Sequence, residues 1–279
     1  MIKIKLDKPF KFDNTITCGQ IFRYIKNEDY SYDIILKDRV INVFVKNDYL
    51  YASSNNDQDL KKIIINYFDL ENDYESINKY LIKNDEKIKD AVIFSDGFKI
   101  IRQDPFETLI SYIISANNGV PQITNALNNI AKKYGKKVMF NNKEYYLFPD
   151  YKDLKDVKIE EFRNCKVGFR DKYIKSIIDK LNNNEISLEE SFKLNTNDAL
   201  LKLMENKGIG MKVASCILLF SYQKYDVFPV DTWVKKVMKR KYNIEGEKKI
   251  REFAKEKYDK YSGIAIQYMF NYGRNKEKE

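Results

Sequence analysis

The stretch ENKGIGMKVASC, from Glu205 to Cys216, contains a Gly-Ile-Gly turn, then a lysine, then a run that can form a helix. Glycines allow positive φ and leave backbone amides uncovered by side chains. Such amides at a helix N-terminus bind anions well, and a DNA phosphate is the obvious anion. A bare G-x-G turn is equally typical of an ordinary helix–helix connection. The turn by itself therefore predicts two tightly joined helices at about residues 200–222.

Lys212 adds a chemical function to this turn. It falls in the first turn of the second helix, where the positive end of the helix dipole and burial both disfavour a protonated amine. A neutral amine is a nucleophile. Cys216 follows four residues later, on the same face of the helix. A solvated lysine is the commoner outcome at such a position, so the interpretation depends on further residues.

Asp231 is the third residue of this group. It follows Pro229 in VFPVDTW and precedes a predicted helix, TWVKKVMKRKY, which it is placed to cap. A carboxylate beside a reactive amine can also stabilise positive charge that develops on a sugar ring. The helix carries five cations, which suit a phosphate backbone or a solvated face: Lys235, Lys236, Lys239, Arg240 and Lys241.

Charge and two scarce residue types limit the classes of function. Lysine plus arginine number 50 against 41 acids, a net charge of +9 that favours nucleic acid as a partner. The chain has no histidine, which excludes Ser-His-Asp hydrolases and histidine metal sites. Its three cysteines, Cys18, Cys165 and Cys216, form no C-x-x-C pair, which argues against zinc and iron–sulfur sites. We expect no metal and no cofactor.

Hydropathy predicts a protein that does not enter a membrane. No apolar run approaches the ~18 residues that a membrane span requires. The start, MIKIKLDKPF, lacks the cationic region and apolar core of a secretion signal. We therefore expect a cytoplasmic protein. We also expect a monomer, as the simplest assembly.

The periodicity of apolar residues predicts an α+β protein. The first ~55 residues alternate like strands, and YDIILKDRVINVFVKNDYLYAS predicts three strands with turns at 37–38 and 47–48. Helical spacing begins at about Asp57. From Asp104, a cap followed by Pro105, nearly everything to the end predicts helix, and one such helix ends at Gly135. We expect a sheet domain with bridging helices over residues 1–98 and a helical domain over 99–279.

The motifs taken together resemble those of the helix-hairpin-helix–GPD superfamily of DNA glycosylases. L-x-x-x-x-G-I-G-x-K-V-A followed by P-V-D is similar to the superfamily's hairpin. CGQIFRY, IRQDPFETLISYIISANN and VGFRDKYI, in that order, resemble segments of its 8-oxoguanine DNA glycosylase/AP lyase branch. The resemblance spans most of the chain and implies a TATA-binding-protein-like sheet domain before the helical domain. The missing cysteine cluster excludes the iron–sulfur branch, and Lys212 argues against the alkylation-repair branch.

The resemblance also implies an activity: removal of 8-oxoguanine from duplex DNA by base flipping, followed by strand cleavage. Lys212 would attack C1′ and form a Schiff base, and Asp231 would stabilise the oxocarbenium-like transition state. The carbonyl of Gly19 would accept the N7–H that guanine lacks. The implied base-binding residues are Gly19, Cys216, Phe270, Gln267, Ile266 and Pro229. The implied DNA-binding residues are Asn117, Asn118, Gln122, Phe169, Arg170, Gly208, Gly210 and Trp233.

Four positions depart from the pattern of eukaryotic members. Gln122 replaces an arginine that reads the orphaned cytosine, Phe169 replaces an intercalating tyrosine, and Trp233 replaces a phosphate-binding histidine. A glutamine is expected four residues before Phe270, where this chain has Ile266, with Gln267 one residue later. One residue rotates a helix position by about 100°.

Two alternatives remain open at this point. The same scaffold can act on another damaged base. A helix-hairpin-helix protein can also bind DNA without catalysis, although phosphate binding alone needs none of Lys212, Cys216 and Asp231.

Overall fold

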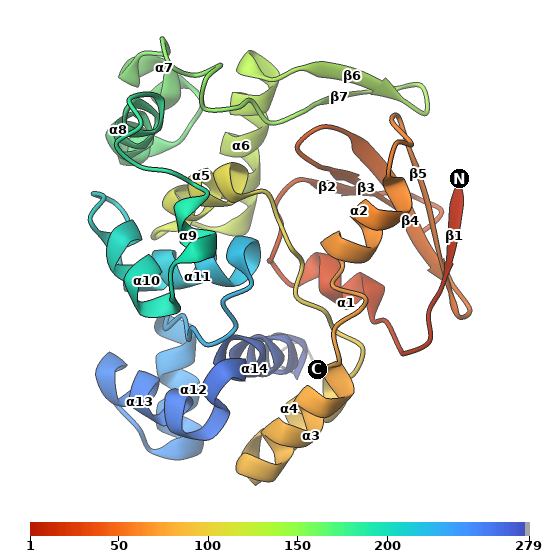
Figure 1. Cartoon of the computed structure of the whole chain (residues 1–279), viewed down its shortest axis with the longest axis vertical. Coiled ribbons are helices and arrows are strands. Elements are labelled where there is room, and N and C mark those ends of the chain that lie inside the picture. The colour runs from red at the N-terminus through yellow and green to blue at the C-terminus, as the bar shows by residue number, and fades with distance from the viewer. Residues whose placement is uncertain (277–279) are drawn as a thin grey trace.

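A computed structural model describes residues 1–276. Within this range, five strands form an antiparallel sheet in the order β1-β5-β4-β3-β2 (Figure 1). The strands are β1 (Ile2–Lys5), β2 (Tyr24–Lys26), β3 (Tyr32–Ile35), β4 (Val40–Lys46) and β5 (Tyr49–Ser54). The helices α1 (Phe12–Thr17) and α2 (Leu60–Tyr67) share one apolar core with the sheet. The alternating pattern thus places one face of each strand in that core.

The three strands predicted between residues 32 and 53 are confirmed, including both turns. Asn47 occupies the left-handed region at the tip of the β4–β5 hairpin, with φ of 52°. The strand-like interpretation was wrong for residues 12–17, which form α1. Phe12 and Ile16 lie four residues apart on the buried side of this helix. One and a half turns are too short for a 3.6-residue period to stand out against alternation.

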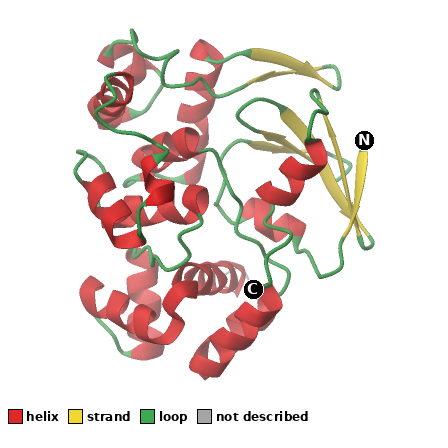
Figure 2. Ribbon diagram, in the orientation of Figure 1, coloured by secondary structure: helices red, strands yellow, loops and turns green. Residues whose placement is uncertain are grey.

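The rest of the described chain is largely helical (Figure 2). The helices are α3 (Tyr74–Asn84), α4 (Lys89–Phe94), α5 (Pro105–Ser115), α6 (Val120–Tyr134), α7 (Ile159–Asn164), α8 (Asp171–Asn182), α9 (Glu190–Lys193), α10 (Thr196–Met204), α11 (Met211–Tyr222), α12 (Thr232–Tyr242), α13 (Glu247–Tyr258) and α14 (Ser262–Lys276). Their shared core contains most of α11 and just over half of α5, and these two helices pack against each other. The predicted α+β arrangement, a sheet domain before a helical domain, is confirmed.

Two predicted helix boundaries hold, one of them for a different reason. Asp104 caps α5, and its carboxylate accepts from the amides of Phe106 and Glu107 at 3.1 and 3.0 Å. Gly135 ends α6, but its φ of −85° is open to any residue. A Cβ on Gly135 would stand 1.9 Å from the carbonyl oxygen of Leu147. Close approach of two backbones, and not a left-handed cap, requires this glycine.

A β-hairpin interrupts the region that periodicity assigned to helices. Its strands are β6 (Lys137–Phe140) and β7 (Lys143–Tyr146), joined by Asn141 and Asn142 with φ of 49° and 59°. Two residues at positive φ form the type I′ turn that fits the twist of paired strands. The Asn-Asn pair was the available signal for this hairpin. Figure 1 shows it extending from α6 over the sheet domain.

The bridging helices α3 and α4 pack on α13 and α14, so they contribute to the helical core. Residues 60–68 instead belong to the core beneath the sheet. The domain boundary after residue 98 stays a prediction.

Candidate active site

The glycine turn lies between α10 and α11 and differs at its two glycines. Gly208 has φ of +91°, and a Cβ there would stand 2.6 Å from the ring of Tyr173. Gly210 has φ of −91° and caps α11, with nothing within 4 Å of a Cβ. Conformation and packing therefore require Gly208. The open space at Gly210 leaves the first amides of α11 accessible to an anion.

Lys212 begins α11 with a half-buried side chain. Its ammonium nitrogen lies 5.5 Å from the ring centroid of Tyr112 on α5. Tyr112 is buried and stacks almost parallel on Phe220, with centroids 5.6 Å apart. Sequence reasoning missed Tyr112 because its spacing in α5 is that of any core residue. The tertiary structure makes its ring a platform for the predicted nucleophile.

Cys216 connects Lys212 with Asp231. Burial raises the pKa of the Cys216 thiol, the Lys212 ammonium opposes that rise and the Asp231 carboxylate adds to it. Lys212 and Asp231 therefore both lie within electrostatic range of Cys216. Asp231 caps α12, and its Oδ1 accepts from the amide of Val234 at 2.8 Å. Within residues 1–276, Oδ2 of Asp231 has no hydrogen-bond partner, so one carboxylate oxygen remains free to face a substrate.

The segment that carries Gly19 is fixed by its neighbour. Gly19 has φ of +94°, a conformation that favours glycine. The side chain of Gln20 is buried and donates to the carbonyl of Lys99 at 2.8 Å, while its oxygen accepts from the amide of Ile101 at 2.9 Å. Arg274 on α14 donates to the Thr17 carbonyl at 3.2 Å, beside Gly19. This arginine was absent from the sequence prediction.

Three of the other residues predicted to contact the base lie on the C-terminal helix, α14, and the fourth precedes α12. Phe270 is half-buried and meets Trp233 edge to face, with ring centroids 5.1 Å apart. Gln267 is half-buried, whereas Ile266 is only 2% exposed and belongs to the helical core. Of these two candidates, Gln267 alone offers a polar group near an open surface. Pro229 is buried in the segment that leads to α12.

Asn117, Phe169 and Arg170, three of the predicted DNA-binding residues, lie near one another. Asn117 is exposed at φ of 53°, and Phe169 is 62% exposed. Arg170 is buried beneath both: its guanidinium donates to the carbonyls of Ala116 and Asn117 and lies 4.4 Å from the Phe169 ring. Arg170 therefore binds groups of the protein itself and connects the backbone of Asn117 with the ring of Phe169.

Asn118 and Gln122, two more of the predicted DNA-binding residues, have different environments. The Asn118 amide nitrogen donates to the Ile114 carbonyl at 3.2 Å, and its oxygen accepts from the amide of Gly119 at 3.0 Å. Asn118 therefore shapes the turn before α6. Gln122 is exposed on the first turn of α6 and is free to face a partner.

The cations of α12 are not equally available. Lys235 pairs with Glu247 at 2.6 Å and Lys239 with Glu245 at 2.9 Å. Lys236 and Arg240 are exposed, and neither forms an ion pair within the part of the chain that the structure describes. Lys241 forms no ion pair in that part of the chain either, but it is half-buried, so Lys236 and Arg240 are the exposed side chains that can neutralise phosphates without breaking a contact.

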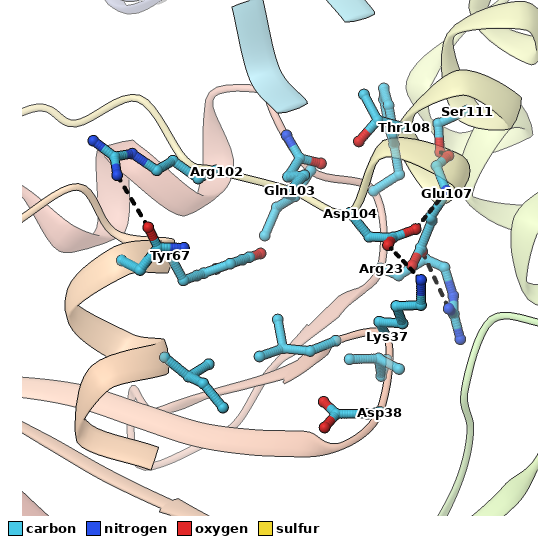
Figure 3. Close-up of a pocket in the computed structure, with 16 residues that line it drawn as sticks. Arg23, Lys37, Asp38, Tyr67, Arg102, Gln103, Asp104, Glu107, Thr108 and Ser111 are labelled. Atoms are coloured by element: carbon cyan, nitrogen blue, oxygen red, sulfur yellow. Dashed lines mark hydrogen bonds and ion pairs between the residues drawn. The ribbon is translucent and has the colours of Figure 1, made fainter. Parts of the chain in front are cut away.

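A cavity of about 210 Å³ lies between the sheet domain and the start of α5 (Figure 3). Figure 3 shows Arg23 and Glu107 pointing toward one another, and their charged atoms are 3.1 Å apart. Arg23 also donates to Asn128 and to the carbonyl of Tyr146. Lys212, Cys216 and Asp231 do not line this cavity. Arg23, the last residue of the G-Q-x-F-R segment, therefore joins the two domains.

Among residues 1–276, no group of three or more metal-ligating side chains occurs. Over the same range, no helix combines the length and the apolar character that a membrane crossing demands.

Two family descriptions match the chain in tandem. Residues 2–109 match the N-terminal domain of 8-oxoguanine DNA glycosylase, and residues 110–260 match the HhH-GPD superfamily base excision DNA repair protein. The chain belongs to the HhH-GPD superfamily. Its tandem arrangement is that of the 8-oxoguanine glycosylase branch, so the family resemblance of the sequence motifs is confirmed. Members of this branch are DNA N-glycosylases and DNA lyases of base excision repair.

Solved structures of HhH-GPD proteins superimpose closely on this one. The apo-form of an 8-oxoguanine glycosylase/lyase from Clostridium acetobutylicum is 41% identical, with a TM-score of 0.92 over 97% of this chain and 95% of that chain. The complex of that enzyme with duplex DNA containing cytosine opposite 8-oxoG gives 39% identity and a TM-score of 0.92, over 99% of both chains. A probable N-glycosylase/DNA lyase from Methanothermobacter thermautotrophicus is 29% identical over 240 residues, which are 77% of this chain and 75% of that protein.

Proposed function

We propose that this HhH-GPD protein removes 8-oxoguanine from duplex DNA and then cleaves the strand, with Lys212 as the nucleophile. The observation that carries the proposal is that Lys212 on α11 and Asp231 at the cap of α12 both act on the Cys216 thiol, so the three groups share one region of the helical domain. The Lys212 amine, after losing a proton, attacks C1′ as the bond from C1′ to the base breaks, and the base leaves with the bonding electrons and takes up a proton. The amine adduct then opens the sugar to a Schiff base. Loss of a C2′ proton breaks the C3′–O bond and nicks the strand.

Asp231 has an electrostatic role in this proposal. Breaking the glycosidic bond places positive charge on the sugar ring, and a fixed carboxylate stabilises that charge. The helix cap supports the role, because Oδ1 is held by the Val234 amide and the carboxylate cannot rotate freely. The same geometry leaves Oδ2 for the sugar.

Recognition of the base is proposed to combine one polar contact with stacking. The Gly19 carbonyl accepts the N7–H of 8-oxoguanine, whereas guanine would present a second acceptor to it. Cys216 and Phe270 line the two faces of the base, and Gln267 reads its Watson–Crick edge. The half-buried state of Gln267 and the burial of Ile266 support this choice between the two.

Flipping of the base leaves a gap in the duplex. We assign Asn117 to that gap and Phe169 to the wedge beside it, supported by their exposure and by Arg170 beneath them. Gln122 is the proposed contact to the opposite base. Gly208 and Gly210 present amides to a phosphate, and the single set of Lys212, Cys216 and Asp231 in each chain supports action as a monomer.

Borohydride trapping tests the catalytic assignment. The protein is mixed with duplexes that hold 8-oxoguanine opposite each of the four bases, with undamaged guanine as the control. We expect a covalent protein–DNA adduct only with the lesion. Lys212→Gln abolishes the adduct and the excision but keeps DNA affinity, measured by fluorescence anisotropy.

Lys207→Gln is the matched control, because Lys207 is an exposed lysine in the same turn. It retains trapping. Excision that survives in Lys212→Gln would remove Lys212 from the mechanism. If the wild-type protein binds these duplexes without forming any adduct, its substrate is another damaged base or its hairpin only binds DNA. The four yields measure what Gln122 does to opposite-base preference.

A further inference from the structure

A pocket with mainly cationic side chains among its charged residues lies on the sheet domain, far from the glycine turn. It has a volume of about 530 Å³ and is bounded by β1, the segment after it, α2 and residues 70–72. Figure 1 places β1 and α2 on the opposite side of the molecule from α10 and α11. The charged residues that line it are Lys3, Lys5, Asp7, Lys8, Lys61, Glu71 and Lys99. Five of these seven are cations.

Lys99 forms the buried end of this pocket. The residue is only 3% exposed, yet within residues 1–276 its ammonium has neither a hydrogen bond nor an ion pair. Its contact is with the ring of Tyr74, whose centroid lies 4.1 Å from the nitrogen. Asp69, the nearest buried carboxylate, is already engaged by the Tyr74 hydroxyl and by Arg102. An ammonium this deep in the pocket and without a counter-ion favours the binding of an anion.

The electrostatics of Lys99 agree with this view. Burial lowers the pKa of Lys99 to about 8, with a smaller contribution from Lys8 in the same direction and opposing contributions from Asp69 and Asp96. A bound anion at the nitrogen would favour the protonated amine.

The rim adds unpaired charge of the same sign. Lys8 pairs with Asp73 at 2.8 Å, whereas Lys3, Lys5 and Lys61 form no ion pair within the described chain. Asp7 and Glu71 are likewise unpaired there. The ammonium of Lys3 lies over the ring of Tyr49 on β5, 3.8 Å from its centroid, so Lys5, Lys61 and Lys99 are the unpaired cations directed to the pocket. They outnumber the two unpaired carboxylates, and the net positive charge favours a phosphate anion.

A simpler explanation accounts for part of this cluster. β1 is an edge strand, and lysines on an edge strand discourage pairing with another chain. That explains Lys3 and Lys5. It does not explain Lys99, which lies outside the strands and is buried.

We propose that this pocket binds the phosphate group of a small molecule, with Lys99 at its base and Lys61 at its rim. Lysine ammonium groups bind phosphate as point charges, and the volume is sufficient for a phosphorylated metabolite. The proposed DNA chemistry uses no side chain of this pocket, and the Lys99 carbonyl to which Gln20 donates is kept in a side-chain variant.

Equilibrium dialysis with radiolabelled inorganic phosphate, at fixed ionic strength and pH 7, tests the proposal. We expect Lys99→Met and Lys61→Met each to weaken phosphate binding at this site at least tenfold. Lys62→Met is the matched control, since Lys62 is an exposed lysine on α2 that does not line the pocket, and it leaves binding unchanged. Phosphate held at the glycine turn contributes equally in all variants. Equal binding by Lys62→Met, Lys61→Met and Lys99→Met would overturn the proposal.

DNA supplies phosphate too, and a second measurement separates the two sources. Binding of a lesion-containing duplex by Lys61→Met and Lys99→Met should match the wild type, with the same dependence on salt. A loss of DNA affinity and a shallower salt dependence in both variants would assign the pocket to the DNA backbone instead, and would also overturn the proposal. Lys61→Met keeps the test valid if Lys99→Met folds poorly.

Discussion

Replacement of Arg23 by methionine should destabilise the protein in a way that depends on pH. Arg23 is buried, and its partner Glu107 has a side chain only 17% exposed, with 3.1 Å between the charged atoms. Removing one member of a buried ion pair typically costs about 3–5 kcal/mol, because the other charge stays buried. Loss of the contacts to Asn128 and the Tyr146 carbonyl adds to that cost. We therefore expect the free energy of unfolding to fall by about 4 kcal/mol at pH 7.

The sign of the pH effect follows from Glu107. Burial raises its pKa, and the Arg23 guanidinium opposes that rise. Without Arg23, the folded state favours protonated Glu107 more strongly than the unfolded state does. Stability then decreases as the pH rises between the unfolded and the folded pKa. Each pH unit is worth 1.36 kcal/mol, so moving from pH 7 to pH 5 should recover as much as ~2.7 kcal/mol.

Urea unfolding at pH 5 and pH 7 measures this effect, with the fluorescence of the single tryptophan, Trp233, and circular dichroism as probes. Coincident transitions of the two probes justify a two-state treatment. Arg23→Met is compared with Glu107→Gln and with the double variant. The double variant should recover most of the loss and lose the pH dependence. A penalty that is the same at both pH values, or that the Glu107→Gln background does not reduce, would refute the reasoning.

Four further predictions concern the proposed site. Asp231→Asn should lower the single-turnover rate of excision by about 10²–10³-fold. The melting temperature should stay nearly constant because asparagine also caps helices. A large shift of the melting temperature would contradict a role in catalysis. Gly208→Ala should cost about 2 kcal/mol, from positive φ and the contact with a tyrosine ring, and lower the melting temperature by roughly 4–8 °C. Tyr112→Leu should slow excision about fivefold, the equivalent of a ~1 kcal/mol contact by which the ring positions the Lys212 side chain, with DNA affinity retained. Tyr112→Phe should behave like the wild type, and an equal loss in both variants would shift the role from the ring to the hydroxyl. Lys236→Met should reduce the slope of log affinity against log salt by about 1, and an unchanged slope would place this lysine away from the backbone.

Local sequence signals determined the parts of this protein that depend on local backbone physics. Asp104 and Asp231 cap helices because a carboxylate next to free amides needs no distant partner. The glycine turn and the three consecutive strands follow from similar short-range preferences. The Asn141-Asn142 turn carried a signal of the same kind, which helical spacing on both sides obscured.

Contacts between residues far apart in the chain were decided only by the tertiary structure. Tyr112 lies beneath Lys212, and Arg23 meets Glu107, only because α5 is packed between the sheet domain and α11. Ile266 and Gln267 are neighbours in sequence, and packing of α14 buried the first and left the second partly open. Arg170 is held by the carbonyls of a turn 53 and 54 residues away. Periodicity shows that a face is buried, but the identity of the group across that face depends on how the helices assemble.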